Sequence, residues 1–566
     1  MRLIKICSSS LSGPNTVRVV LLLIILSALA FRLYGLDLIP LNHDENNLAA
    51  KSIDIIKEGK GDLIFNVPVS FYSGKEIILF YLFVFLSSRF FLDPAIAVRV
   101  PSVIFGVLTV FFTYLIASKM YNSRKAGALS ALFLAFLPWH IIMSRIGFKA
   151  IMAPFFGAII FYFLYAGVKD KKTILFLSSF AALGIGSFYT YPSAWVFIPV
   201  FALSLIILKK TYGRPGRREV FFGFMLFFVS IVPLLTLALK VNFLKNQTYH
   251  SIFKMIGFSD PGFYSVFFNN FIINLGKSFR LFFFPGHSPI GLFAPAITAP
   301  LMVSAAVLPL VVFSLVYAVR KRSAADIIML IWLLLAFLGP CLFSKDGIEA
   351  RFLLTVLPVP LVLTARLLAD LYDHSSRSKA LRIVILVISF SVITRSTGIM
   401  AEYYAVASDN KGEWLMNSFG SRDAAGYLFE DNSEKDYAFI TDFRMTVVPY
   451  LKYYTRLFDD RKEIFGRPSE HLKNYEAYKF IALYSDRPGG PGKGILEFEN
   501  KLLEENKVVY YFLWSPETHP DSEHVFLGGF SRLSRIFRES HPRANPVKKI
   551  LYPDGSTAIE VFKVYR

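Results

Sequence analysis

Long apolar stretches recur along the chain from Val19 to Ile399, and they constrain the fold more than any other feature. A helix needs about 20 apolar residues to cross the hydrocarbon core of a bilayer, which is roughly 30 Å thick. Backbone groups in lipid must hydrogen-bond within their own segment, so such stretches are predicted to be transmembrane helices. They lack the short apolar–polar alternation of an outer-membrane barrel. The sequence therefore predicts an α-helical polytopic membrane protein.

Basic residues gather in five short loops, and two apolar segments separate each loop from the next. These residues are Lys119, Arg124 and Lys125; Lys169, Lys171 and Lys172; Lys209, Lys210, Arg214, Arg217 and Arg218; Arg320, Lys321 and Arg322; and Arg377, Lys379 and Arg382. Lys and Arg collect in cytoplasmic loops, so all five loops are predicted to be cytoplasmic. The same bias explains the net charge of +20 without a nucleic-acid partner.

This alternation predicts eleven spans, with the N-terminus in the cytoplasm and the C-terminus outside. The spans are 18–35, 97–118, 127–143, 151–168, 173–187, 194–208, 219–239, 297–319, 326–343, 353–371 and 381–398. The remaining apolar run, Ile77–Leu92, is interrupted by Arg89 and would reverse every later loop if it crossed. We interpret it as an interfacial or re-entrant helix in a first outer loop, 36–96. A second long outer loop is predicted at 240–296.

The composition changes near Ala401, where charged residues become frequent and apolar runs shorten. Strands are predicted at 437–441, 480–484 and 508–514, helices at 413–429 and 495–505, and a turn at Asp554-Gly555 between two final strands. The chain is therefore divided into a transmembrane domain, 1–400, and a soluble extracytoplasmic α/β or α+β domain, 401–566. The only cysteines, Cys7 and Cys341, make no disulfide framework.

The acidic pair Asp44-Glu45 follows the first span directly, next to His43. Two adjacent carboxylates near a membrane surface suit a general base and an acceptor or metal ligand. The alternative is that Asp44 caps a helix that begins at Glu45.

Several cations fall in predicted outer loops, against the positive-inside bias. They are Lys75, Arg145, Lys149, Arg280 and Arg351. Either they hold an anionic ligand at the outer membrane face or they extend toward lipid phosphates. Tyr189 and Tyr191 lie at an outer span end as well, where they either stack on a sugar or form part of an aromatic belt.

Several motifs together resemble the GT-C membrane glycosyltransferases, most closely family 39, which includes protein O-mannosyltransferases and bacterial aminoarabinose transferases. The motifs are Leu38-Ile39-Pro40 with Asp44-Glu45, Tyr72-Ser73-Gly74-Lys75-Glu76, Arg99-Val100-Pro101-Ser102, Pro138-Trp139-His140 with Ser144-Arg145-Ile146-Gly147-Phe148, Gly184-Ile185-Gly186 with Tyr189-Thr190-Tyr191, and Phe284-Pro285-Gly286-His287-Ser288. Their order and spacing carry the resemblance over most of residues 30–400.

The resemblance implies an inverting glycosyltransferase in a bacterial or archaeal plasma membrane. Such an enzyme moves a sugar from a polyprenyl-phosphate carrier to a lipid, glycan or protein acceptor at the outer face. It would act in protein glycosylation, or in modification of lipopolysaccharide or another cell-envelope glycan. Asp44 is implied as the base with Glu45 beside it, and basic outer-loop residues are implied to hold the carrier phosphate.

The remaining candidates are His43, Glu76 and His287, which are assigned to the acceptor or to a divalent metal; the metal itself is left open. The chain departs from the family pattern after the acidic pair, where Asn46, Asn47 and Leu48 stand, and this leaves the donor sugar open. Two other classes stay as alternatives, a transporter or flippase of lipid-linked sugars and an oligosaccharide ligase or polymerase.

Overall fold

The computed structural model describes most of the membrane region and part of the C-terminal domain. The described residues are 14–37, 41, 45, 48–49, 52, 68–69, 74–75, 79–91, 93–213, 215–240, 263–283, 308–343, 350–374, 379–409, 423, 427, 437–441, 499–500, 503–504, 508–515, 534, 537–551 and 556–565. The predicted strand at 480–484, the turn at Asp554-Gly555 and most of the two predicted C-terminal helices lie outside them.

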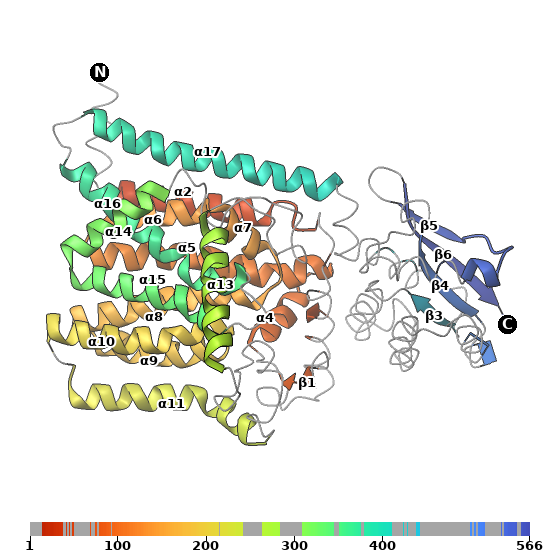
Figure 1. Ribbon diagram of the computed structural model, residues 1–566, viewed down its shortest axis with the longest axis horizontal. Helices are drawn as coiled ribbons and strands as arrows, with labels where there is room; N and C mark the ends of the chain where they lie inside the picture. The colour runs from red at the N-terminus through yellow and green to blue at the C-terminus, as the bar shows by residue number, and fades with distance from the viewer. Residues whose placement is uncertain are drawn as a thin grey trace.

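Helices dominate residues 14–409 and run side by side (Figure 1). In chain order they are α2 (Pro14–Leu33), α4 (Leu79–Ser88), α5 (Pro94–Tyr121), α6 (Arg124–Ala135), α7 (Pro138–Arg145), η1 (Lys149–Ile151), α8 (Met152–Lys169), α9 (Thr173–Phe188), η2 (Pro192–Val196), α10 (Phe197–Tyr212), α11 (Arg217–Lys240), α13 (Phe263–Phe283), α14 (Leu308–Lys321), α15 (Ala324–Phe343), η5 (Ala350–Val356), α16 (Pro358–His374) and α17 (Lys379–Asp409).

Each predicted span falls on one of these helices, or on the pair α6–α7, wherever it is described; residues 297–307 of the span predicted before Arg320 lie outside the described residues. In the part of the chain that the structure describes, seven helices are long and apolar enough to cross a membrane, and the pair α6–α7 makes an eighth span if it is counted as one. That pair bends by 60° where Pro138 begins α7, since proline lacks the amide hydrogen that a continuous helix would use. The chain is an integral membrane protein.

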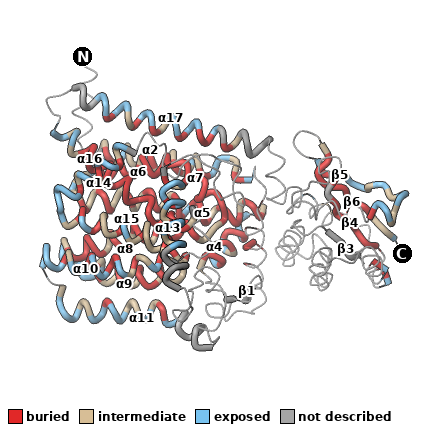
Figure 2. Tube along the Cα trace, in the orientation of Figure 1, coloured by how far each residue is buried: buried red, intermediate tan, exposed pale blue. Residues whose placement is uncertain are grey.

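The helices form a buried centre and an exposed rim (Figure 2). In the most apolar stretch of each span, 100% of the residues are buried for α16 and 78% for α8, whereas only 17% are buried for α2 and 33% for α17. Rim helices expose leucine, isoleucine, valine and phenylalanine, the surface that a protein presents to lipid rather than to water. Because lipid excludes water, polar groups in the centre must be hydrogen-bonded by other groups of the protein.

The predicted basic loops lie together at one end of the bundle, which we call the basic end. Lys119 at the end of α5 pairs with Asp170 after α8, and Lys125 in α6 pairs with Asp373 in α16. Farther along the same end, Tyr317 of α14 donates to Asp370 of α16 at 2.8 Å. Because these contacts bring the loops to the same end, the two helices between the first and second loops, and between the fourth and fifth, run in opposite directions, as the predicted topology requires.

Two helices in the predicted outer loops stand apart from the spans. The predicted interfacial run is found as α4, which buries Phe80, Tyr81 and Val84. The predicted loop 240–296 contains α13, which was not expected and runs across the direction of the spans (Figure 1). Its inward side chains Asn274 and Ser278 contact Cys341 of α15, both at 3.3 Å.

A four-stranded sheet lies in the C-terminal part of the chain. Its order is β3 (Tyr437–Thr441), β4 (Val508–Trp514), β6 (Thr557–Tyr565), β5 (Lys548–Leu551). Strand β3 is parallel to β4, whereas β6 is antiparallel to both β4 and β5. The strands predicted at 437–441 and 508–514 and the pairing of the final two strands are thereby confirmed.

Candidate active site

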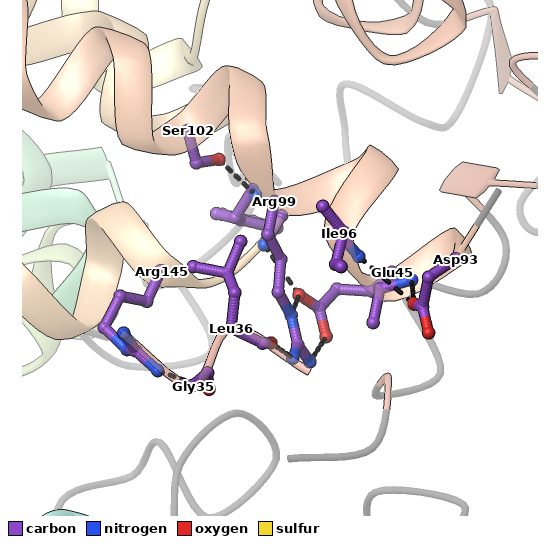
Figure 3. A network of polar contacts seen from close by, with 11 residues as sticks. Gly35, Leu36, Glu45, Asp93, Ile96, Arg99, Ser102 and Arg145 are labelled. Carbon is purple, nitrogen blue, oxygen red and sulfur yellow. Dashed lines mark hydrogen bonds and ion pairs between the residues drawn. The ribbon is translucent and has the colours of Figure 1, made fainter. Parts of the chain in front are cut away.

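Glu45 is anchored by a buried ion pair at the end of the bundle opposite the basic end. Its side chain is 2% exposed and accepts from Arg99 of α5 through two bonds, Nε to Oε1 and Nη2 to Oε2, both 2.8 Å (Figure 3). The Gly147 amide donates a third bond to Oε1 at 2.7 Å. A bidentate, buried carboxylate of this kind is fixed in position, so Glu45 holds the first loop against α5.

Arg99 fixes a second point of the same loop. Its Nη1 donates to the Leu36 carbonyl at 2.6 Å, so one guanidinium joins Leu36 and Glu45 (Figure 3). Arg99 lies in the first turns of α5, whose start is capped by Asp93 through bonds to the amides of Ala95 and Ile96. Asp44 precedes Glu45 in the chain and lies outside the described residues. The anchor therefore restrains the immediate neighbour of the predicted base.

Gly147 allows the turn after α7 to approach α5 closely. A Cβ atom there would lie 2.1 Å from Cγ1 of Val98 and 3.3 Å from Oε1 of Glu45, so only glycine fits without movement. The next amide, of Phe148, donates to Oγ of Ser102 at 3.2 Å. Two successive amides of this turn thus bind Glu45 and α5.

Phe148 begins a cluster of aromatic and cationic side chains beside the anchor. Its ring lies 5.7 Å from Tyr191, which in turn lies 5.8 Å from Phe352. The Arg351 guanidinium lies 5.3 Å from the Phe148 ring centre and 5.8 Å from that of Phe352. Lys149 follows Phe148 and begins η1, which packs against η5. We call Phe148, Lys149, Tyr191, Arg351 and Phe352 the aromatic–cation cluster.

The structure brings together five of the residues predicted from sequence: Glu45, Arg145, Lys149, Tyr191 and Arg351. Arg145 ends α7 and donates to carbonyls at the end of α2. Tyr189 is half-buried just after α9.

The other predicted residues are not among these five. Arg280 is exposed on α13 and is not part of it. Lys75 lies in the short strand β2 (Gly74–Lys75), which pairs with β1 (Pro68–Val69). His43, Asp44, Glu76 and His287 lie outside the described residues.

Two buried arginines beside this group were not predicted as site residues. Arg99 and Arg32 are each 5% exposed or less, although both lie in apolar helices. Arg32 Nη2 donates to His140 Nδ1 at 2.8 Å, and since guanidinium only donates, His140 is neutral and carries its proton on Nε2. A charge within an apolar span marks a functional or paired position. That signal could have singled out both arginines.

Metal ligation is not supported among the residues that the structure describes. No group of three or more His, Cys, Asp or Glu side chains there could hold an ion. The predicted metal candidates lie outside the described residues; they are His43, Glu76 and His287. Whether the protein binds a metal therefore stays open.

The chain is similar to known proteins in part of its sequence and in its fold. Residues 76–236 match the model of a family described as dolichyl-phosphate-mannose-protein mannosyltransferase. The structure superposes on ArnT from Cupriavidus metallidurans bound to undecaprenyl phosphate with a TM-score of 0.56, 12% identity and coverage of 96% of this chain and 97% of that one. This chain has the GT-C fold of membrane glycosyltransferases. The resemblance seen in the sequence is confirmed at the level of fold and family model.

A second GT-C structure agrees. The Archaeoglobus fulgidus oligosaccharyltransferase tethered with an acceptor peptide matches with a TM-score of 0.51 and 12% identity, over 97% of this chain and 74% of that one. The apo state of ArnT matches with a TM-score of 0.51 and 13% identity over the same extents as the bound state. A search of curated protein sequences found no match.

Proposed function

We propose that the chain is an inverting glycosyltransferase that takes a sugar from a polyprenyl-phosphate carrier and transfers it to a lipid, glycan or protein acceptor at the outer membrane face. The observation that carries the proposal is the Glu45 anchor. It restrains the residue next to Asp44 and, through Gly147, lies one residue from the aromatic–cation cluster. This supports a base and cations for a phosphate leaving group at the same end of the bundle, opposite the basic loops.

The chemistry assigns one role to each carboxylate. Asp44 accepts the proton of the acceptor's nucleophilic group, and the oxygen or nitrogen of that group forms a bond to the anomeric carbon. Glu45 is engaged by Arg99 and Gly147, so it holds the loop and leaves the base role to Asp44. The bond from the anomeric carbon to the phosphate oxygen breaks on the opposite side, which inverts the configuration.

Cations assist the departure of the carrier. The leaving group is a polyprenyl phosphate, whose negative charge grows as the bond breaks, and we assign Lys149 and Arg351 to stabilise it. Support comes from the contact of η1, which Lys149 begins, with η5, which contains Arg351. Lys75 and Arg280 stay candidates from the sequence. Tyr191 belongs to the same cluster and Tyr189 lies two residues before it, and both stay candidates for contact with the sugar. ArnT from Cupriavidus metallidurans, which shares the fold, was solved with undecaprenyl phosphate bound.

The sidedness follows from the positive-inside bias. If the basic end faces the cytoplasm, the Glu45 anchor and the C-terminal domain face outward. A plasma membrane of a bacterium or archaeon is the proposed location.

The test is release of the carrier. The purified protein is incubated with a panel of polyprenyl-phosphate sugars in the presence of lipid, glycan and peptide acceptors. We expect free polyprenyl phosphate to appear with one donor class, together with a glycosylated acceptor. A transporter or flippase would move the donor across a vesicle membrane without cleaving it. A ligase or polymerase would release carrier only when the donor bears a pre-assembled glycan.

A further inference from the structure

The end of α2 presents main-chain carbonyls that have no partner within the helix. The last four carbonyls of any helix lack intrahelical donors, and near a bilayer the protein itself must satisfy them. Arg145 of α7 satisfies two of them, since its Nη1 lies 3.2 Å from the Phe31 carbonyl and 3.0 Å from that of Arg32. It also donates to the turn that follows α2, through Nη1 to Tyr34 at 2.5 Å and Nη2 to Gly35 at 2.8 Å. A cation at this position also complements the negative end of the helix dipole.

Tyr404 of α17 completes this contact from the other side. Its hydroxyl lies 3.3 Å from the Phe31 carbonyl and 3.5 Å from that of Tyr34. Its ring lies 4.9 Å from the Arg145 guanidinium and packs edge-on against the Tyr34 ring. We call Arg145 and Tyr404 the α2 clasp. It joins the first span to α17.

The clasp and the Glu45 anchor act on one continuous piece of chain. Gly35, held by Arg145, is followed by Leu36, held by Arg99, and Arg99 also binds Glu45. The start of the first loop and the residue after Asp44 are therefore fixed to the same pair of helices, α5 and α7. Any displacement of the end of α2 would therefore act on contacts that also hold Glu45, the residue after Asp44.

We propose that Arg145 is a positioning residue for the Asp44 loop rather than a ligand of the carrier phosphate. Tyr404 acts with it. Arg145 is 4% exposed and both of its terminal nitrogens already bind main-chain carbonyls. Its remaining donor, Nε, has no hydrogen-bond partner among the described residues but is itself buried, so a phosphate would have to displace the surrounding protein to reach this guanidinium. This inference rests on the proposed function, because it assigns a role within that reaction.

The experiment compares Arg145→Ala, Arg145→Lys and Tyr404→Phe with Arg351→Ala and with Arg395→Ala, an exposed arginine on α17. Donor transfer gives kcat and KM, calorimetry with undecaprenyl phosphate gives Kd, and hydrogen exchange reports on amides 34–41. Arg145→Ala should lower kcat about 100-fold, the cost of an ångström-scale misplacement, and leave Kd within about twofold. Hydrogen exchange of amides 34–41 should be faster in Arg145→Ala than in the unmodified protein. The increase should be smaller in Arg145→Lys and Tyr404→Phe and absent in Arg395→Ala. Arg351→Ala should instead weaken Kd about tenfold.

The opposite pattern would overturn the inference. If Arg145→Ala weakens undecaprenyl phosphate binding about tenfold and leaves exchange unchanged, Arg145 is a phosphate ligand. If both kcat and exchange are unchanged, it positions nothing. Should Arg145→Ala not fold, the milder Tyr404→Phe and Arg145→Lys variants decide by the same readouts. If the unmodified protein cleaves no donor, the proposed function fails, and hydrogen exchange still decides whether the clasp holds the loop.

Discussion

Individual residues at the Glu45 anchor carry the most specific consequences of the structure. Two polar main-chain groups and two charged side chains converge there in a space that excludes water, where an unmatched group is costly. Each contact is short and each partner is buried. Substitutions at the anchor should therefore act on folding and on catalysis together.

Gly147 should tolerate no side chain. Gly147→Ala puts a methyl group 2.1 Å from Val98, so the turn must move and the Glu45 bond must lengthen or break. We expect a lower melting temperature and a loss of donor turnover. Gly276→Ala on α13 is the matched control, because nothing lies within 4 Å of its added Cβ. Equal behaviour of the two variants in thermal unfolding would show that the close approach at Gly147 is not real.

The Glu45–Arg99 pair should behave as one unit. Removing one partner of a buried ion pair costs about 3–5 kcal/mol because the other charge is left without compensation. Glu45→Gln and Arg99→Gln should each reduce stability strongly, while the double variant loses less than the sum of the two, with a coupling of about 0.5–3 kcal/mol. Asp373→Asn breaks the exposed pair with Lys125 and should change stability little. Strict additivity in denaturant unfolding would argue against the pair.

At the scale of elements, α13 is the departure from the sequence prediction. Its apolar residues alternate with Asn269, Asn270, Asn274 and Lys277, so it contains no apolar run long enough to span and was interpreted as loop. The pattern instead suits a helix that lies along a surface, with Ile272 exposed and Asn274 buried.

A disulfide can test the place of α13. Ser278 Oγ lies 3.3 Å from Cys341 Sγ, so Ser278→Cys in a Cys7→Ser background should form a disulfide with Cys341 on mild oxidation. Phe279→Cys, one residue on and exposed, should not. Titration of free thiols before and after oxidation is the measurement. Two reactive thiols that persist in the Ser278→Cys protein would place α13 elsewhere.

Over the whole molecule, the sequence predicted the spans well and the site only in part. Span positions depend on local apolar content, which can be read directly from residues such as those of α8 and α16. The partner of Glu45 could not be read in this way, because Arg99 lies 54 residues away within a predicted span. The role of Arg145 likewise depends on a helix end that is 110 residues distant in sequence. Contacts of that range follow from packing, which one sequence does not reveal.

The topology gives a prediction for the molecule as a whole. Single cysteines at positions 214 and 480 of a cysteine-free protein should react from opposite sides of a sealed vesicle, the first from the cytoplasmic side and the second from outside. The reason is that Arg214 falls in a loop predicted to be cytoplasmic, whereas Phe480 follows the last predicted span. Impermeant maleimide labelling distinguishes them. Reaction of position 214 from the outside would invert the proposed sidedness.

The most direct test of the proposed reaction is the turnover of Asp44→Asn. Asparagine keeps the size of aspartate but cannot accept a proton, and general-base catalysis is worth roughly 10²–10⁴-fold. With a donor that the unmodified protein cleaves, we predict that release of polyprenyl phosphate falls by about that factor while the protein stays folded and binds undecaprenyl phosphate with unchanged Kd. Asparagine caps a helix as well as aspartate does. An Asp44→Asn protein with nearly full turnover would therefore show that Asp44 is a cap and not the base.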